Sequence, residues 1–309
     1  REYVTRDGKR IRPVLVVSGF LSYADDAAPD LFTTALSIEI LHDFMLIHDD
    51  IIDKSDTRRG DPAMHVMLGR HLSRFKAPQV SGADLAIVIG DVLYAMGVEA
   101  FLAVDVSPAR KEKALHQFIK AGVFTGVGEF IELETGLIDL DTLQKETIYR
   151  VYDYKTAYYT FAYPLCIGAT LAGADDAEVQ RLYEYGTRLG RAFQIRDDII
   201  GMFHDEQDIG KSALTDLQEA KKTVLIWYAY TNGSDTQRKR IRELMEKPNA
   251  GMDDLREMRR LLTDTGALDY AKSEITSLIA EAKEILRATS VKSGYRSMLL
   301  SFADKILSV

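Results

Sequence analysis

Apolar residues recur at intervals of three and four along most of the chain. The pattern is clearest in three stretches: "LFTTALSIEILHDFMLIHDD" at 31–50, "RLYEYGTRLGRAFQIRDDII" at 181–200 and "YAKSEITSLIAEAKEILRA" at 270–288. This spacing places apolar side chains on one face of a helix. Alternating runs bounded by hairpin turns, which are typical of strands, are absent. The pattern therefore predicts an all-α protein.

Short breaks separate the periodic segments, at 25–30, 58–62, 76–82, 105–109, 204–212, 231–235 and 246–251. None is long or polar enough to be an interdomain linker, and no repeat appears. We therefore expect one domain over residues 1–309. Pro164 interrupts one helical pattern, and Gly122, Gly126 and Gly128 crowd another. Such residues mark either a bend that lines a cavity or ordinary close packing between helices.

Composition narrows the possible functions. Of 309 residues, 46% are hydrophobic, which suffices for a sizeable core. The formal charge of −8 argues against nucleic-acid binding and against a polybasic membrane anchor, so an anionic ligand needs a local cluster of cations. We expect no membrane span and see no signal peptide. Whether a segment precedes Arg1 stays open.

Cysteine usage adds one constraint. Cys166 is the only cysteine, which excludes an intrachain disulfide and a cysteine-based zinc site. A single thiol fits a reducing compartment, and we expect the cytoplasm.

The stretch "HDDIIDKSDTRRG" at 48–60 carries the first candidate chemistry. In a helix, Asp49 and Asp53 stand one turn apart and about 40° apart around the axis. Two carboxylates on one face suit magnesium, which prefers oxygen ligands. The alternative is a solvated acidic helix end. A second such stretch, "AFQIRDDII", places Asp197 and Asp198 at the end of an apolar run, and we expect the two acidic faces to hold metal ions between them.

Cations stand at motif-like places around these two stretches. They are Lys9 and Arg12 in "DGKRIRP", Arg58 and Arg59 in "TRRG", Lys155 in "YKTA", Lys211 in "GKS", and Lys221 and Lys222 in "EAKKT". Magnesium together with many Lys and Arg donors suits a diphosphate. The chain lacks a GxxxxGK[ST] loop, so a P-loop nucleotide enzyme is disfavoured.

Taken in order, these motifs resemble those of the trans-isoprenyl diphosphate synthases in the polyprenyl synthetase family. The matching elements are "GKRIRP", "DDIIDKSDTRRG", Gly90–Asp91, Lys155–Thr156, "FQIRDDII", and the later "GK" and "KKT". The resemblance implies a terpenoid-synthase fold, with helices around a deep central cavity, and a homodimer. It also implies head-to-tail condensation of isopentenyl diphosphate with dimethylallyl, geranyl or farnesyl diphosphate.

The resemblance also assigns roles residue by residue. Three magnesium ions are implied, two at Asp49 and Asp53 and the third at Asp197. The allylic diphosphate would contact Arg58, Lys155, Lys211 and Lys221, with Gln194 nearby. Isopentenyl diphosphate would contact Lys9, Arg12, His42 and Arg59. Gly201 stands where the family's second motif has its third aspartate, so metal binding there is expected to rest on Asp197, together with Asp198 or the later Asp205.

Product length is expected to depend on residues one and two helical turns before Asp49, because one turn spans about the length of an isoprene unit. These are Phe44 and Met45, then Leu41. One aromatic residue beside methionine resembles short-chain synthases, so we expect geranylgeranyl diphosphate, with farnesyl or longer products as alternatives. Phe44 also has a simpler interpretation as a core residue.

Two other functions compete with the synthase. A class I terpene cyclase shares the first acidic stretch and the fold, but it needs no isopentenyl diphosphate site, so "GKRIRP" and the paired arginines disfavour it. A non-catalytic subunit of a heteromeric synthase would have lost motif aspartates or arginines, whereas here only the Gly201 position departs.

Overall fold

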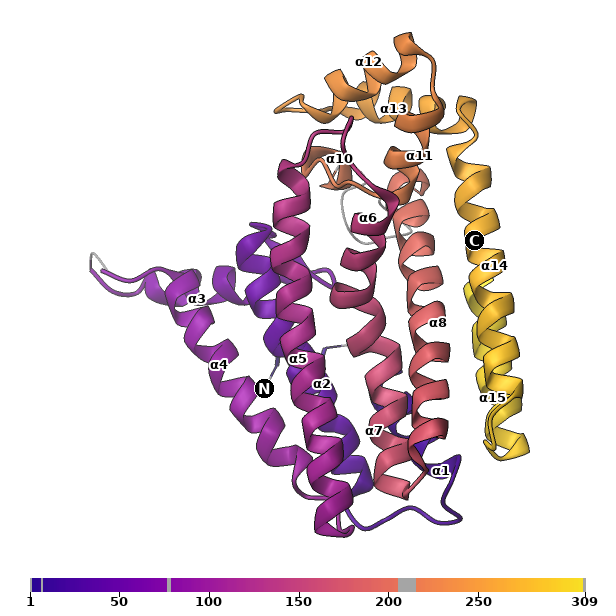
Figure 1. Cartoon of the computed structure of the whole chain (residues 1–309). Coiled ribbons are helices and arrows are strands. Elements are labelled where there is room, and N and C mark those ends of the chain that lie inside the picture. Colours follow the sequence, from indigo (N-terminus) through magenta and orange to yellow (C-terminus); the bar gives the residue numbers. More distant parts are fainter. Residues whose placement is uncertain (1, 7, 77–78, 205–214, 308–309) are drawn as a thin grey trace. The chain divides into compact units, whose positions relative to one another are not determined.

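The computed structural model describes residues 2–6, 8–76, 79–204 and 215–307, and its regular secondary structure is helical apart from one ribbon of two short strands (Figure 1). The predicted all-α class is confirmed. Contacts divide the chain into two compact units. Unit 1 comprises Arg1–Gly122 and Pro164–Asp175, and unit 2 comprises Val123–Tyr163 and Asp176–Val309.

Unit 1 is built on α2, which packs against α1 and α4. Its elements are α1 (Ile11–Leu21), α2 (Leu31–Ile52), β1 (Thr57–Arg58), β2 (Asp61–Pro62), α3 (Met64–Leu72), α4 (Gly82–Phe101), the first half of α5 (Pro108–Leu137) and most of α7 (Tyr163–Ala172). Buried Leu31, Ala35, Ile38 and Leu41 recur along α2 at intervals of three and four and form part of the core.

The predicted breaks in unit 1 separate these elements. The break at 25–30 lies between α1 and α2, and the break at 58–62 forms the antiparallel ribbon of β1 and β2. At the end of the break at 76–82, Ser81 caps α4: its hydroxyl accepts from the Asp84 N–H, and the Asp84 carboxylate accepts from the Ser81 N–H. This reciprocal pairing fixes where α4 begins.

Length and composition alone would allow α2 to cross a membrane. Half of its most apolar 18-residue stretch is buried inside the protein, however. Glu39, Asp43 and Asp50 are also buried along this helix. Burial against α1 and α4 accounts for its apolar composition as that of a core helix. The absence of a membrane span stays a prediction.

Unit 2 places α8 (Asp176–Phe203) against α14 (Ala267–Arg287) and against η1 (Asp153–Ala162). Its other elements are the second half of α5, α6 (Lys145–Tyr152), α10 (Thr215–Gln218), α11 (Val224–Asn232), α12 (Asp235–Met245), α13 (Met252–Asp264) and α15 (Ser293–Leu307). The predicted breaks at 231–235 and 246–251 fall between α11, α12 and α13. The break at 204–212 lies almost wholly outside the described residues.

The interruption predicted at Pro164 takes an unusual form. The ten residues Asp153–Ala162 form a π-helix, and α7 begins at Tyr163, directly before the proline. Proline has no N–H to donate back into the preceding turn, so it suits the first turn of a new α-helix. Wide π-turns are often found at functional sites, and this one carries Lys155 and Thr156.

Some glycines lie where two helix backbones approach closely. A Cβ on Gly190 of α8 would lie 2.4 Å from the Ala157 Cα of η1, and one on Gly128 of α5 would lie 2.4 Å from the Lys155 nitrogen. Gly126 has open space around it, and α5 is continuous through all three of its crowded glycines. Of the two interpretations, close packing therefore applies at Gly128.

Candidate active site

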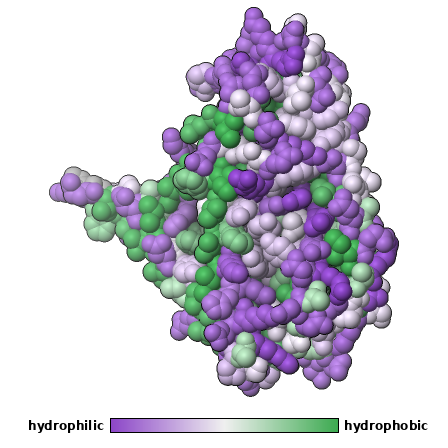
Figure 2. Space-filling view, viewed as in Figure 1, coloured by the Kyte–Doolittle hydropathy of each residue, from purple (hydrophilic) through white to green (hydrophobic). Residues whose placement is uncertain are grey.

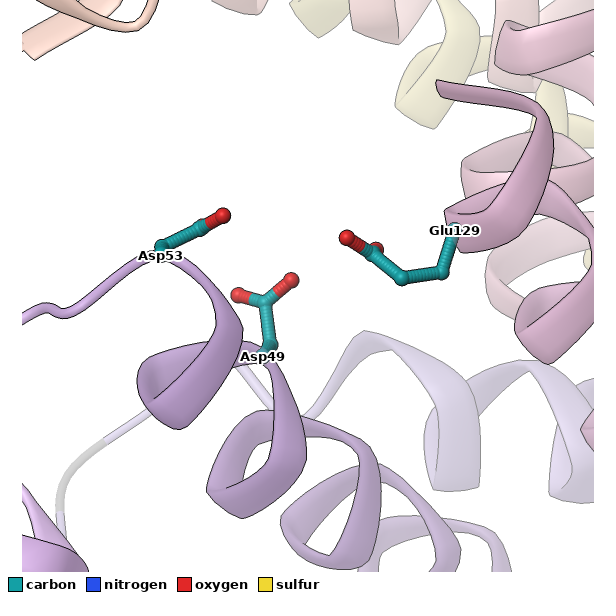
Figure 3. A group of neighbouring side chains, drawn as sticks. All are labelled: Asp49, Asp53 and Glu129. Carbon is teal, nitrogen blue, oxygen red and sulfur yellow. The ribbon is translucent and has the colours of Figure 1, made fainter. Parts of the chain in front are cut away.

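The end of α2 presents the first acidic motif. Asp49 and Asp53 lie one turn apart, both partly exposed, and Figure 3 shows their carboxylates on the same side of the helix end. The helix stops here because Lys54 adopts a left-handed conformation (φ 54°). The Ser55 N–H then donates to the Asp50 carbonyl at 2.9 Å and the Lys54 N–H to the Ile51 carbonyl at 3.4 Å. These two bonds are the pattern that commonly closes a helix.

The aspartate between them has a different environment. Asp50 is fully buried, and its carboxylate accepts from Arg58 Nε at 2.7 Å and from the Tyr3 hydroxyl at 3.2 Å. Burial raises the pKa of Asp50. Sequence reasoning assigned Asp50 no role. Its burial could have been predicted, because Asp50 lies one turn after the apolar Leu46 and Ile47 and so shares their side of the helix.

Arg58 connects the two acidic positions. Its Nη2 donates to Asp49 Oδ2 at 3.0 Å while its Nε contacts Asp50. Because a guanidinium donates in several directions at once, one arginine satisfies both carboxylates. Arg58 therefore lies beside the candidate magnesium ligands, as a residue for the allylic diphosphate should.

A cluster of arginines surrounds His42 on the same helix. His42 is buried, and its pKa is lowered well below the ordinary value by burial and then by Arg12, Arg59, Arg58 and Arg10. The imidazole is thus neutral at physiological pH. Three predicted isopentenyl diphosphate residues, Arg12, His42 and Arg59, are brought together in this way. Lys9 is exposed on the segment before α1, and Arg10 is a member of the cluster that sequence reasoning did not assign.

Arg59 is held by a strained turn. Arg59 and Gly60 both have positive φ, 58° and 80°, between the paired strands β1 and β2. Two such residues in succession make the tight hairpin turn that suits the twist of paired strands, but a left-handed arginine is uncommon. The turn brings the Arg59 guanidinium to Arg6, whose carbonyl accepts from Arg59 Nη1 at 3.4 Å.

The residues expected to limit product length lie on two sides of α2. Phe44 packs against the apolar cluster that contains Ile47, Ala86 and Leu93, and its ring centroid is 5.5 Å from that of Tyr94. Leu41 and Met45 instead lie near Gly122, where an added Cβ would contact both side chains and Tyr94. Tyr94 was missed because nothing in the sequence pairs α4 with this part of α2.

In unit 2, the second acidic motif belongs to a hydrogen-bonded chain of side chains. The Thr156 hydroxyl donates to Gln194 Oε1 at 2.6 Å, and Gln194 Nε2 donates to Asp198 Oδ1 at 3.0 Å. The Tyr152 hydroxyl donates to the other oxygen of Asp198 and accepts from the Val224 N–H at 3.0 Å. Asp198 is buried within this chain, whereas Asp197 is exposed. Asp197 is therefore the aspartate of this pair that can offer its oxygens to a metal ion.

Two of the predicted lysines of unit 2, Lys155 and Lys221, have carboxylate neighbours. Lys155 pairs with Glu129 at 2.7 Å and with Glu132, both on α5; Glu129 is the third side chain drawn in Figure 3. Lys221 pairs with Glu219 at 2.9 Å. Lys211 and Asp205 lie outside the described residues. Sequence reasoning did not find Glu129 and Glu132, since their partner Lys155 is distant from them in the chain.

Lys222 has a contact with the backbone at the end of α5. Its ammonium donates to the carbonyls of Thr135 at 3.1 Å and Gly136 at 2.7 Å, and also to that of Ile138. Burial lowers its pKa. Thr135 and Gly136 belong to the last turn of α5 and Ile138 follows it, so Lys222 caps that helix end.

The donor sets fit magnesium chemically. Asp49 and Asp53 supply adjacent carboxylates in unit 1, and Asp197 supplies one in unit 2; hard oxygen ligands of this kind, completed by water and phosphate, are those that magnesium prefers.

Comparison with known proteins gives a consistent result. The polyprenyl synthetase family profile matches residues 1–262. The geranylgeranyl diphosphate synthase of Methanosarcina mazei is 32% identical over 100% of this chain and 88% of its own length. The geranylfarnesyl diphosphate synthase of Aeropyrum pernix is also 32% identical, over 97% of this chain and 90% of its own.

A solved structure is similar over the whole chain. It is geranylgeranyl pyrophosphate synthase from Corynebacterium glutamicum, complexed with isoprenyl diphosphate and magnesium, at a TM-score of 0.90 and 27% identity, covering 100% of this chain and 88% of that one.

Proposed function

The chain belongs to the polyprenyl synthetase family and is a prenyltransferase, and we propose that it condenses isopentenyl diphosphate with allylic diphosphates to form geranylgeranyl diphosphate. One observation in unit 1 carries the proposal. The same helix, α2, presents an acidic pair at its end and an arginine cluster around neutral His42, with Arg58 beside both. A condensing enzyme needs two diphosphate sites, one with metal ligands and one with cations alone.

In this proposal Asp49, Asp53 and Asp197 hold magnesium, three ions in total. When bound, magnesium neutralises charge on the departing diphosphate. Arg58, Lys155, Lys211 and Lys221 bind the same diphosphate and, with Gln194 nearby, fix its position. Preorganised cations of this kind stabilise the charge that develops as the allylic carbon–oxygen bond breaks.

Isopentenyl diphosphate is assigned to Lys9, Arg12, His42 and Arg59. Neutral His42 can donate one hydrogen bond to a phosphate oxygen, while the arginines supply paired donors and charge. Held there, the double bond of isopentenyl diphosphate attacks the allylic cation and forms the new carbon–carbon bond. The tertiary cation that results loses a proton to the released diphosphate, so the reaction needs neither a nucleophile nor a base from the protein. Positioning and exclusion of water are then the main tasks of the chain.

Product length is proposed to depend on Leu41, Phe44 and Met45. If Phe44 stops the growing chain, Phe44→Ala will shift the product beyond twenty carbons, and Phe32→Ala, a change at an exposed residue on the same helix, will not. An unchanged product would leave Phe44 as a core residue of the α2 and α4 cluster.

We also propose a cytoplasmic homodimer. Val88, Val92 and Met96 form an exposed stripe along α4, with exposed fractions of 60%, 53% and 49%. Figure 2 shows hydrophobic side chains gathered along this helix. Apolar stripes of this kind on a water-exposed helix commonly mark a surface covered by another chain.

The proposed reaction is tested by release of diphosphate under four conditions: isopentenyl diphosphate alone, farnesyl diphosphate alone, both together, and both without magnesium. A synthase releases diphosphate only when both substrates and magnesium are present. Release from farnesyl diphosphate alone would favour a terpene cyclase. In the Asp49→Asn, Asp53→Asn double variant we expect turnover to fall by at least about 10³-fold with unchanged helicity, since the metal ligands are lost.

A further inference from the structure

Asp43 is a buried carboxylate with no hydrogen bond. It lies on α2, is 0% exposed, and neither of its oxygens has a hydrogen-bond partner in the described part of the chain. Buried carboxylates without donors are rare because removing the charge from water is costly. This side chain was not singled out by the sequence motifs, and nothing in the proposed reaction uses it.

Two other acids share its side of the helix, and both are paired. Glu39, one turn before Asp43, accepts from Arg10 Nη1 at 2.9 Å and lies 3.7 Å from Arg12 Nη1. Asp50, two turns after, is bonded to Arg58 and Tyr3. Asp43 is therefore the member of this row whose negative charge is compensated only through space.

The charges that act on Asp43 come from three neighbouring segments. Burial raises its pKa to about 7, opposed by Arg59 of the ribbon turn and by Arg10 and Arg12 at the start of α1, while Glu39 on α2 raises it. Tyr3, whose own pKa burial and Asp50 raise, stays neutral in this range. His42 also stays neutral, because burial and the arginines lower its pKa.

The arginines that compensate Asp43 are those assigned to isopentenyl diphosphate, so a link between Asp43 and this substrate rests on the proposed function. A diphosphate that engages Arg12 and Arg59 withdraws part of their charge from Asp43 and places further negative charge nearby. An ionised Asp43 would then be buried without either a donor or compensation. Taking up a proton removes that cost.

We propose that Asp43 accepts one proton from solvent when a diphosphate binds to Arg12 and Arg59, so that binding of isopentenyl diphosphate and protonation of this carboxylate are coupled. The proton adds to a carboxylate oxygen and no other bond changes. By linkage, affinity for isopentenyl diphosphate falls as pH rises above the point where unliganded Asp43 ionises. Asp43 is thus a positioning residue that acts through the arginines.

Calorimetric titration with isopentenyl diphosphate at pH 7.5, in several buffers of different ionisation enthalpy, measures the protons taken up on binding. The proteins compared are the wild type, Asp43→Asn, and Asp26→Asn as a control at an exposed loop position. For each ligand bound, we expect the wild type and the control to take up about half a proton or more in excess of the uptake by the Asp43→Asn variant. Protons exchanged by the ligand itself are the same in all three and cancel.

The dissociation constant provides a second measure. Between pH 7 and pH 8.5 it should rise several-fold more in the wild type than in Asp43→Asn. Asp43→Ser, which is neutral and smaller, should behave like Asp43→Asn and serves if the asparagine variant does not fold.

Equal proton uptake in all variants, with isopentenyl diphosphate bound, would overturn the coupling while leaving the proposed function intact. Failure of the wild type to bind isopentenyl diphosphate would overturn both.

Discussion

At the scale of single residues, the acids along α2 differ by environment rather than by type. Asp49 and Asp53 are partly exposed, Asp50 is buried and paired, and Asp43 is buried without a hydrogen-bond partner among the described residues. The same side chain can therefore serve as a metal ligand, a structural anchor or a titrating group. Burial and the distance to the nearest guanidinium decide which of these roles is open to it.

The first residue-scale prediction concerns Asp50 and its partner. Arg58→Gln should lower the free energy of unfolding by about 3–5 kcal/mol, because it leaves the buried Asp50 charge without its main donor. Urea unfolding measures this, with Arg70→Gln, at an exposed position on α3, as the control. Equal midpoints for the two variants would mean that Asp50 does not depend on Arg58.

A second prediction concerns the effect of pH on stability through Asp43. Its pKa is about 7 in the folded chain and about 3.9 when unfolded, so the folded state binds the proton more tightly. The wild type should then lose stability as pH rises from about 4 to 7, whereas Asp43→Asn should lack this loss. Urea unfolding at several pH values measures this. The free energy of unfolding of Asp43→Asn should exceed that of the wild type by an amount that grows with pH to at most about 4 kcal/mol. A difference that does not change with pH would contradict the assignment.

At the scale of elements, much was predictable from the sequence. The three-and-four periodicity predicted the helices, and its interruptions at 58–62, 76–82 and 246–251 lie at or between the ends of these elements. The spacing of Asp49 and Asp53 predicted a shared face correctly. What could not be predicted depends on tertiary contacts: the burial of Asp50 needs Tyr3 and Arg58, and the π-helix at 153–162 needs a wider turn than residue propensities distinguish.

The packing of α8 on η1 leads to an element-scale prediction. Gly190→Ala should destabilise the protein by about 1–3 kcal/mol, because the new methyl group meets the Ala157 backbone at 2.4 Å. Gly126→Ala is the matched control: it adds the same methyl within α5, where nothing lies within 4 Å, and should stabilise by about 0.5–1 kcal/mol. Thermal unfolding measures both effects. If both variants have the same melting temperature as the wild type, the close approach of α8 and η1 is not required for stability.

At the scale of the whole molecule, the exposed stripe on α4 leads to a prediction about assembly. Wild-type protein should have twice the 34.7 kDa mass of one chain by light scattering after gel filtration. Val92→Glu places a charge in the centre of the stripe and should shift the mass toward that of one chain, because burying an unpaired carboxylate opposes association. Val14→Glu, at an exposed apolar residue on α1, should leave the mass unchanged. A single-chain mass for the wild type would contradict the homodimer.

The central claim is that this chain joins isopentenyl units to an allylic diphosphate and stops at a defined length. The most direct measurement is mass spectrometry of the products formed from magnesium, isopentenyl diphosphate and, separately, dimethylallyl, geranyl or farnesyl diphosphate. We predict one dominant twenty-carbon diphosphate from every primer that is accepted. Folded protein that extends none of the three primers would contradict the claim, and a dominant product of another length would contradict the assignment of Leu41, Phe44 and Met45 as the limit at twenty carbons.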